Sequence, residues 1–219
     1  MIPAFRSNIG DIVIKLIEKL PRELCVAVSG GVDSMTAMHF LSNYHDITAL
    51  HFIHSDSDNS YVESEFVKEQ CDLYNIKLII KEQDSSLQRG QSKEAHWRTG
   101  RYSWFKTFSI PVVIAHTLDD AVETYLFGCM HGVPRIMDYA HANCVRPFLT
   151  TRKEKLIDYA VRHGVSWVHD VTNDDCEFAI RNHIRHKFVP EALVVNPGIF
   201  KVVKRLINEK HHRGNSGNE

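Results

Sequence analysis

The segment Ser29-Gly-Gly-Val-Asp-Ser34 constrains the fold more than any other part of this sequence. It follows an unbroken apolar run, Leu24 to Val28, which is typical of a strand buried on both faces of a parallel sheet. A stretch with helical character, Met35 to Tyr44, comes directly after it. A glycine-rich turn between a buried strand and a helix is the usual phosphate-binding position of an open α/β sheet. We therefore predict an α/β fold with an anion site at this turn.

Strand-like and helix-like segments alternate along most of the chain. The gaps between the expected strands are too long for hairpins, so each connection is expected to be a right-handed β-α-β crossover. This pattern predicts a doubly wound parallel sheet. The expected strands are residues 24–28, 47–53, 76–80 and 111–115, and the expected helices are residues 8–20, 35–44, 61–74, 93–108 and 119–130.

The alternation changes after Gly132. A loop is expected over residues 132–143, followed by the short segment 145–149 and by helices at residues 152–163 and 200–207. Between these two helices, residues 180–189 are rich in Arg, His and Lys. We predict a nucleotide-binding domain over residues 1–145, a small helical C-terminal extension over residues 146–209 and a disordered tail over residues 210–219.

The charge of the chain is small overall but unevenly distributed. Its net charge is −1, which gives no general indication of nucleic-acid binding. Residues 146–219, however, carry +4, whereas residues 1–145 carry −5. If the chain binds a nucleic acid, we therefore expect the C-terminal third to be the part that faces its phosphate backbone.

Composition excludes several classes of protein. No apolar run approaches the roughly 18 residues that a membrane-spanning helix needs, and the first residues lack the pattern of a secretory signal. We therefore expect a cytoplasmic protein without membrane association. The five cysteines are widely spread and form no Cys-x-x-Cys pair, which argues against a disulfide framework and against a local thiolate metal site.

The residue types of the glycine-rich turn suit a phosphate group. Gly30 and Gly31 let the backbone approach an anion closely, and the N–H groups at the start of the helix supply a positive pocket. Ser29 and Ser34 add hydroxyl donors, and Asp33 can hold a magnesium ion or cap the helix. The turn lacks the Gly-Lys-Ser/Thr of a Walker A loop, so it does not predict γ-phosphate transfer.

A second group of polar residues follows the fourth expected strand. Asp119 and Asp120 begin a helix there, and Glu123 lies about one turn further on, so the three carboxylates can converge. Such a cluster can hold a cationic group, bind magnesium or accept a proton. The alternative is that Asp119 only caps the helix while Glu123 is solvated.

Four segments together resemble one family. The Ser-Gly-Gly-x-Asp-Ser turn is the PP-loop pattern, and the other segments occur in the order found in the tRNA(Ile)-lysidine synthetases of the PP-loop ATP-pyrophosphatases. The resemblance covers roughly residues 24–190. The segments that carry it are Lys93-Glu-Ala-His-Trp-Arg98, His116-Thr-Leu-Asp-Asp-Ala-Val-Glu-Thr124, Arg146-Pro-Phe-Leu149, Trp167-Val-His-Asp170 with Asn173, and Arg181-Asn-His-Ile-Arg-His186.

The resemblance implies an adenine nucleotide alpha hydrolase-like fold and a reaction. ATP, with Mg²⁺, adenylates the C2 oxygen of the wobble cytidine of tRNA(Ile) with a CAU anticodon, and the amine of free lysine displaces AMP. Relatives that are dimers also imply a homodimer. The implied nucleotide site comprises Ser29, Gly30, Gly31, Val32, Asp33, Ser34 and His116. Asp33 is also the implied metal ligand. The implied catalytic residues are Asp33, Asp119, Asp120 and Glu123, and the implied lysine and tRNA contacts are Asp119, Glu123, Lys93, Glu94, Arg98, Arg181, Asn182 and Arg185.

The chain also departs from the family pattern. Thr117 replaces the second residue of a His-His pair, and His131-Gly-Val-Pro134 replaces an Arg-Gly-x-Gly segment. The sequence ends soon after the Arg181–His186 segment, so the additional C-terminal domains of longer members are expected to be absent. Two other functions stay open, namely another PP-loop tRNA-modifying enzyme such as a thiolase, and a non-catalytic nucleotide- or RNA-binding module.

Overall fold

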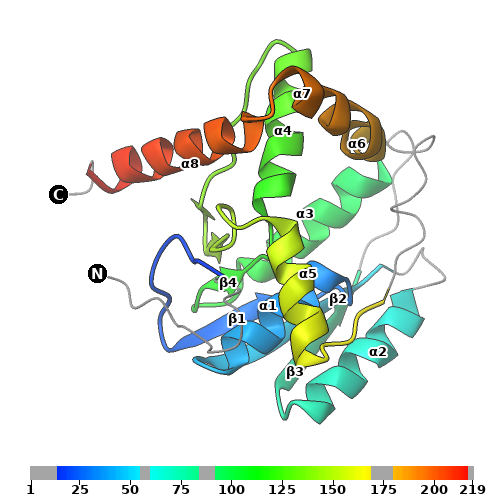
Figure 1. Cartoon of the computed structure of the whole chain (residues 1–219). Helices are drawn as coiled ribbons and strands as arrows, with labels where there is room; N and C mark the ends of the chain where they lie inside the picture. Colours follow the sequence, from blue (N-terminus) through cyan, green and yellow to red (C-terminus); the bar gives the residue numbers. More distant parts are fainter. Residues whose placement is uncertain (1–13, 55–59, 84–91, 169–179, 217–219) are drawn as a thin grey trace.

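A mostly parallel six-stranded sheet organises the chain (Figure 1). The computed structural model describes residues 14–54, 60–83, 92–168 and 180–216. The strands are β1 (Glu23–Ala27), β2 (Asp46–Ile53), β3 (Lys77–Glu82), β4 (Val112–Val113), β5 (Ala140–His141) and β6 (Cys144–Val145). Their order is β3-β2-β1-β4-β6-β5, and only β5 is antiparallel to its neighbour. The predicted doubly wound parallel sheet is confirmed.

The chain reverses its direction of winding at β1. It proceeds from β1 outward through β2 to β3 and then returns to β4 on the other side of β1. In doubly wound sheets, ligands bind outside the carboxyl ends of the strands at such a reversal. The topology therefore places a binding site at the ends of β1 and β4.

Helices cover both faces of this sheet. The helices are α1 (Val32–Ser42), α2 (Ser60–Leu73), α3 (Lys93–Phe105), α4 (Leu118–Met130), α5 (Lys153–His163), α6 (Ile180–His183), the π-helix η2 (Ile184–Phe188), α7 (Val189–Val195) and α8 (Ile199–Ser216). Leu24 and Val26 of β1 belong to the core beneath α1, α2 and α5, whereas Cys25 belongs to the core beneath α3. Alternate residues of β1 are thus buried on opposite faces, which explains its unbroken apolar sequence.

Residues on both sides of position 145 share the larger core. Phe148, Leu156 and Ala160 are fully buried in the cluster that also contains Met35 and Met38 of α1. Helix α5 packs directly against α1. The first helix of the predicted C-terminal extension therefore stabilises the nucleotide-binding part of the molecule.

The remaining helices form a separate cluster around α4. Leu118, Val122 and Leu126 of α4 pack with Val203 and Ile207 of α8, and α7 contributes partly buried residues. In Figure 1 these helices stand above the sheet, with α8 crossing α4. This cluster fixes the start of α4 at the end of β4, where the acidic residues lie.

Two expectations at the ends of the chain were wrong. Residues 14–20 of the expected helix 8–20 are not helical, because their backbone groups bond elsewhere: Ile17 N–H donates to Pro147 O, and Thr151 Oγ1 donates to Lys15 O. Helix α8 continues to Ser216, so the tail expected to be disordered from residue 210 is helical over 210–216. The contact of His211 Nε2 with Glu18 Oε1 at 2.9 Å holds this last part of α8.

We predict that Phe148→Ala lowers the free energy of unfolding by about 3–5 kcal/mol, since Phe148 is fully buried between the sheet and α1. Val161→Ala on α5 is the control, because Val161 is 67% exposed and its loss is expected to cost less than about 0.5 kcal/mol. Urea unfolding measures both. Equal effects of the two substitutions would contradict a core shared across position 145.

Candidate active site

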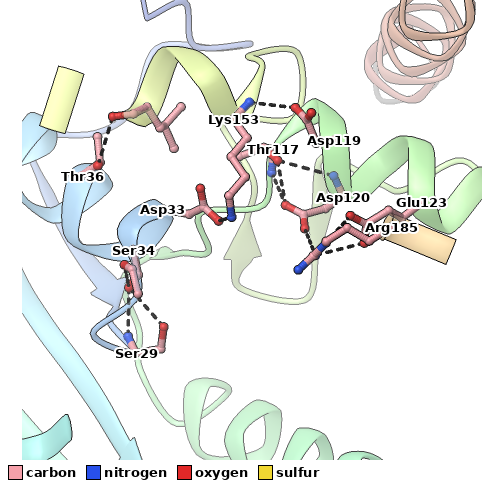
Figure 2. Close-up of polar contacts among 12 residues, drawn as sticks. Ser29, Asp33, Ser34, Thr36, Thr117, Asp119, Asp120, Glu123, Lys153 and Arg185 are labelled. Carbon is pink, nitrogen blue, oxygen red and sulfur yellow. Dashed lines mark hydrogen bonds and ion pairs between the residues drawn. The ribbon is translucent and has the colours of Figure 1, made fainter. Parts of the chain in front are cut away.

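The glycine-rich turn Ser29–Ser34, which we call the phosphate loop, joins β1 to α1. Gly30 has φ +91°, a conformation that favours glycine, and Gly31 is the N-cap of α1. The two serines close the loop on itself, because Ser34 Oγ accepts from Ser29 N–H at 3.1 Å and lies 3.2 Å from Ser29 Oγ (Figure 2). The loop is therefore fixed by its own hydroxyls, with the free N–H groups of the first turn of α1 beside it.

The loop is also tied to the segment that follows α5. Val168 N–H donates to Gly30 O at 2.9 Å. Val168 belongs to the Trp167–Asp170 motif, so the described first half of this motif reaches the phosphate loop. His169, Asp170 and Asn173 lie outside the described residues.

Asp33, in the first turn of α1, is held by a lysine from α5. Lys153 Nζ lies 2.7 Å from Asp33 Oδ2 (Figure 2). Burial raises the pKa of Asp33, although the positive charge of Lys153 opposes this effect. Asp33 Oδ1 is buried and has no hydrogen-bond partner among the residues that the structure describes. A buried carboxylate oxygen without a partner fits a cation, so Asp33 is suited to hold Mg²⁺.

Asp119 points toward α5 and serves as its cap. Asp119 Oδ2 accepts from Lys153 N–H at 2.7 Å, and Arg152 Nε lies 3.2 Å from the same oxygen. Lys153 is the first residue of α5, whose N-cap Arg152 makes no side-chain cap of its own. Asp119 therefore caps α5 rather than α4, and Glu123 is largely buried, so the alternative that Asp119 only caps its own helix while Glu123 is solvated was wrong.

Asp120 and Glu123 meet the arginine of η2. Asp120 Oδ2 accepts from Thr117 N–H at 2.7 Å, so Asp120 completes the capping box of α4. Arg185 donates through Nε to Glu123 Oε1 at 2.6 Å and through Nη2 to Glu123 Oε2 at 3.0 Å (Figure 2). Its Nη2 also lies 3.4 Å from Asp120 Oδ1. Of the three carboxylates predicted to converge, Asp120 and Glu123 thus meet at a protein cation, whereas Asp119 faces α5.

These charges alter each other's protonation. Burial raises the pKa of Glu123, while its hydrogen bonds with Arg185 act in the opposite direction. Burial disfavours the charge of Arg185, but the contacts with Glu123 and the charge of Asp120 outweigh burial and raise its pKa. Within the described residues, the four carboxylates Asp33, Asp119, Asp120 and Glu123 therefore face three cations, Arg152, Lys153 and Arg185.

His116 follows β4 and is held by a buried arginine. Arg146 donates from Nε to His116 Nδ1 at 3.1 Å and from Nη2 to Tyr102 Oη at 3.1 Å. Burial lowers the pKa of His116 to about 4, and the charge of Arg146 adds to this effect while that of Asp120 opposes it. His116 is therefore neutral near pH 7, and because Nδ1 accepts a hydrogen bond, its proton lies on Nε2.

A pocket of about 250 Å³ opens at the carboxyl ends of β1, β2 and β4. The phosphate loop forms one side of it, apolar side chains form its interior, and arginines of α3 stand at another side. The lining includes Ser29, Gly31, Asp33, Ser34, Leu50, Phe52, Phe105, Ile114, His116, Arg98 and Arg101. A slot with apolar walls beside an anion site suits a nucleotide, whose base is apolar and whose phosphates are charged.

The remaining predicted residues are distributed differently. Arg98 lines the pocket and lies over the Tyr102 ring at 4.6 Å. Lys93 is exposed at the first residue of α3, and Asn182 is buried in α6; neither lines the pocket. The side chains of Glu94 and Arg181 are not described.

Three cations near the site were not predicted. Arg101 lies one turn along α3 from Arg98, and this i, i+3 spacing was a usable signal. Arg152 and Lys153 carry no such signal, because their importance depends on how α5 docks against α1 and α4.

The described residues contain no group of three or more His, Cys, Asp or Glu that could hold a metal ion. Magnesium is commonly bound by one or two carboxylates together with substrate phosphates and water, so Asp33 alone fits its usual mode. In the same residues, no helix is long and apolar enough to cross a membrane.

A family model described as a PP-loop domain matches residues 3–192, which include the phosphate loop, the acidic residues of α4 and Arg185. The chain belongs to the PP-loop domain family. The PP-loop family predicted from the Ser29–Ser34 turn is therefore confirmed.

Relatives of this PP-loop protein include several tRNA(Ile)-lysidine synthases. That of Exiguobacterium sibiricum is 34% identical over 193 residues, which are 82% of this chain and 46% of the relative. That of Lactiplantibacillus plantarum is 32% identical over 196 residues, which are 81% of this chain and 44% of the relative. The chain thus spans about half the length of these relatives.

Solved structures of other PP-loop proteins share the fold. A U34-tRNA thiolase of Methanococcus maripaludis, solved with its 4Fe-4S cluster, has a TM-score of 0.69 and 14% identity, covering 91% of this chain and 74% of that chain. An NH3-dependent NAD synthetase of Campylobacter jejuni has a TM-score of 0.50 and 14% identity, covering 86% and 84%. At these identities the likeness confirms the adenine nucleotide alpha hydrolase-like fold alone.

We predict that His116 makes the stability of the protein depend on pH. Between about pH 6.5, the usual histidine pKa, and pH 4, the unfolded chain binds a proton that the folded chain does not. The stability of the wild type should therefore fall by up to about 3 kcal/mol relative to His116→Gln as the pH is lowered through this range. Urea unfolding at several pH values measures the difference. A difference that does not change with pH would show that the pKa of His116 is the same in the folded and unfolded states, which would contradict the effect of burial.

Proposed function

We propose that this chain carries out the tRNA(Ile)-lysidine synthetase reaction. In this proposal the C2 oxygen of the wobble cytidine in a CAU anticodon attacks the α-phosphate of ATP and releases pyrophosphate. The ε-amine of lysine then displaces AMP. The observation that carries the proposal is the meeting of the phosphate loop and the carboxylates of α4 at the ends of β1 and β4, bridged by Lys153. The reaction needs these two sites side by side, one for phosphates and one for an amine.

The nucleotide is proposed to bind along the phosphate loop. Gly30, Gly31 and Val32 supply backbone N–H groups for the phosphates, and the apolar slot beside them receives the adenosine. His116, neutral and protonated at Nε2, is a hydrogen-bond donor beside this slot. Bound Mg²⁺ would supply positive charge to the triphosphate, and Asp33 would hold it through the buried Oδ1.

The amine is proposed to be bound by Asp120 and Glu123. A carboxylate with a raised pKa is a better base, and burial has this effect on Glu123, so Glu123 is the proposed acceptor of the proton that the attacking amine loses. Arg185 keeps both carboxylates in place before the amine binds. We assign Asp119 to holding α5 rather than to the amine, because both of its oxygens face Arg152 and Lys153.

The tRNA is proposed to approach over α3 and the C-terminal helices. Arg98 on α3 offers positive charge at the rim of the pocket. Lys93, Arg181 and Asn182 are proposed to contact the RNA on the resemblance alone. Because tRNA and lysine are the proposed substrates, we propose that the reaction takes place in the cytoplasm. A homodimer is proposed on the resemblance alone.

The thiolase alternative is less well supported. The cysteines of the described residues are not paired, and three of the four, Cys25, Cys71 and Cys144, are buried. Burial also raises the pKa of Cys71 to about 11, so its thiolate, the form that attacks or binds metal, is scarce near pH 7. A non-catalytic module would not need buried, paired carboxylates at both sites.

We predict that the purified protein incorporates radiolabelled lysine into unmodified tRNA(Ile) with a CAU anticodon, in the presence of ATP and Mg²⁺. Asp33→Asn should reduce incorporation by about 100-fold or more, because the proposed metal ligand is lost. Asp46→Asn is the control, since Asp46 forms only an exposed ion pair with Arg22. It should leave incorporation unchanged.

Two other results would contradict the proposal at different levels. Formation of AMP and pyrophosphate with total tRNA, but without incorporation of lysine, would retain the PP-loop chemistry and reject lysine or this tRNA. The absence of both incorporation and AMP would favour the binding module.

A further inference from the structure

Lys153 lies where two separate parts of the site meet. Its ammonium contacts Asp33, beside the phosphate loop, and its backbone N–H is bound by Asp119, at the start of α4 (Figure 2). Asp33 and Lys153 are 120 residues apart in the sequence. No motif that we recognised in the sequence includes Lys153, so the fold alone reveals its position.

The backbone of Lys153 is fixed, whereas its side chain has room to move. Asp119 binds the first N–H of α5 at 2.7 Å, and Arg152 Nε, 3.2 Å from the same carboxylate, strengthens this anchor. Leu156 and Ala160 then bury α5 against α1. The side chain of Lys153 is 36% exposed, and its flexible stem lets the ammonium change partner while its Cα stays in place.

The ammonium of Lys153 has more donors than Asp33 can use. A lysine ammonium has three N–H donors, and Asp33 Oδ2 accepts from it at 2.7 Å. Asp33 is in the first turn of α1, whose N–H groups form the anion site of the loop. Lys153 therefore stands beside the position where phosphates are proposed to bind.

Two cations, Lys153 and Mg²⁺, compete for the carboxylate of Asp33 in the proposed reaction. Without nucleotide, Lys153 neutralises this buried group. If Asp33 held Mg²⁺ through Oδ1, the ion would repel the ammonium of Lys153 at Oδ2, and the phosphates of ATP would offer Lys153 another anion. A lysine so placed is expected to turn from the carboxylate to the phosphate.

We propose that Lys153 is a further pyrophosphate-binding residue, which holds Asp33 before ATP binds and contacts the β- and γ-phosphates when ATP is bound. This inference rests on the proposed function. In the adenylation step the cytidine oxygen bonds to the α-phosphorus, and the bond to the bridging oxygen breaks. Its electron pair stays on that oxygen, so the leaving pyrophosphate gains negative charge. Lys153 keeps its proton and stabilises that charge.

Calorimetric titration of the whole chain with pyrophosphate and, separately, with AMP tests this role, both with Mg²⁺ present. Lys153→Met should weaken pyrophosphate binding by about tenfold or more, as expected for the loss of a charge-assisted hydrogen bond, and AMP binding by less than about threefold. Lys155→Met is the control, because Lys155 lies on the same helix and pairs with Asp158 at 3.8 Å. It should change neither affinity.

A second variant separates the charge of Lys153 from its structural contact. Lys153→Gln keeps a hydrogen-bond donor for Asp33 but no charge, so it should fold like the wild type and still lose pyrophosphate affinity. The inference is overturned if a folded variant binds pyrophosphate within about threefold of the wild type, or loses AMP equally. A wild type that binds neither ATP nor pyrophosphate would reject the proposed function, and this inference with it.

Discussion

The docking of the first turn of α5 is the contact on which the site depends. Asp119 binds the backbone of Lys153, and the side chain of Lys153 binds Asp33, so a single residue connects α4 to α1. Neither helix contributes both halves of the site. The pairing of β1 with β4 brings the starts of α1 and α4 to the same edge of the sheet, and α5, buried against α1 and anchored to Asp119 of α4, links them there. The phosphate loop and the acidic helix are local features, whereas their relative position is a property of the tertiary structure.

Local patterns predicted the fold well where the chain's own periodicity decides it. The buried strand Leu24 to Val28 and the helices after it follow from apolar runs and spacing alone. The same method failed for residues 14–20, whose helical spacing reflects burial on two sides of an irregular segment: Leu16 packs into one core and Ile17 into another. It also missed the helical end of α8, because the contact of His211 with Glu18 joins residues far apart in sequence.

The site shows the same division between local and distant contacts. Helical spacing predicted that Asp119, Asp120 and Glu123 would converge beside the phosphate loop; Asp120 and Glu123 do meet at Arg185, whereas Asp119 faces α5. The sequence could not predict their partners. Each carboxylate is matched to a different group, namely a lysine for Asp33, a helix end for Asp119 and an arginine for Glu123. These partners distinguish carboxylates that are equivalent in the sequence pattern. They separate the carboxylates that stabilise the fold from those that are proposed to bind a ligand.

In the proposed reaction, this site splits ATP between its α- and β-phosphates and transfers AMP to an RNA oxygen. Exchange of radiolabelled pyrophosphate into ATP, measured with tRNA but without lysine, tests it most directly, because only a reversible adenylation returns pyrophosphate to ATP. We expect labelled pyrophosphate to enter ATP, and we expect this exchange to require both tRNA and Mg²⁺. Release of orthophosphate and ADP, or no exchange under these conditions, would contradict it.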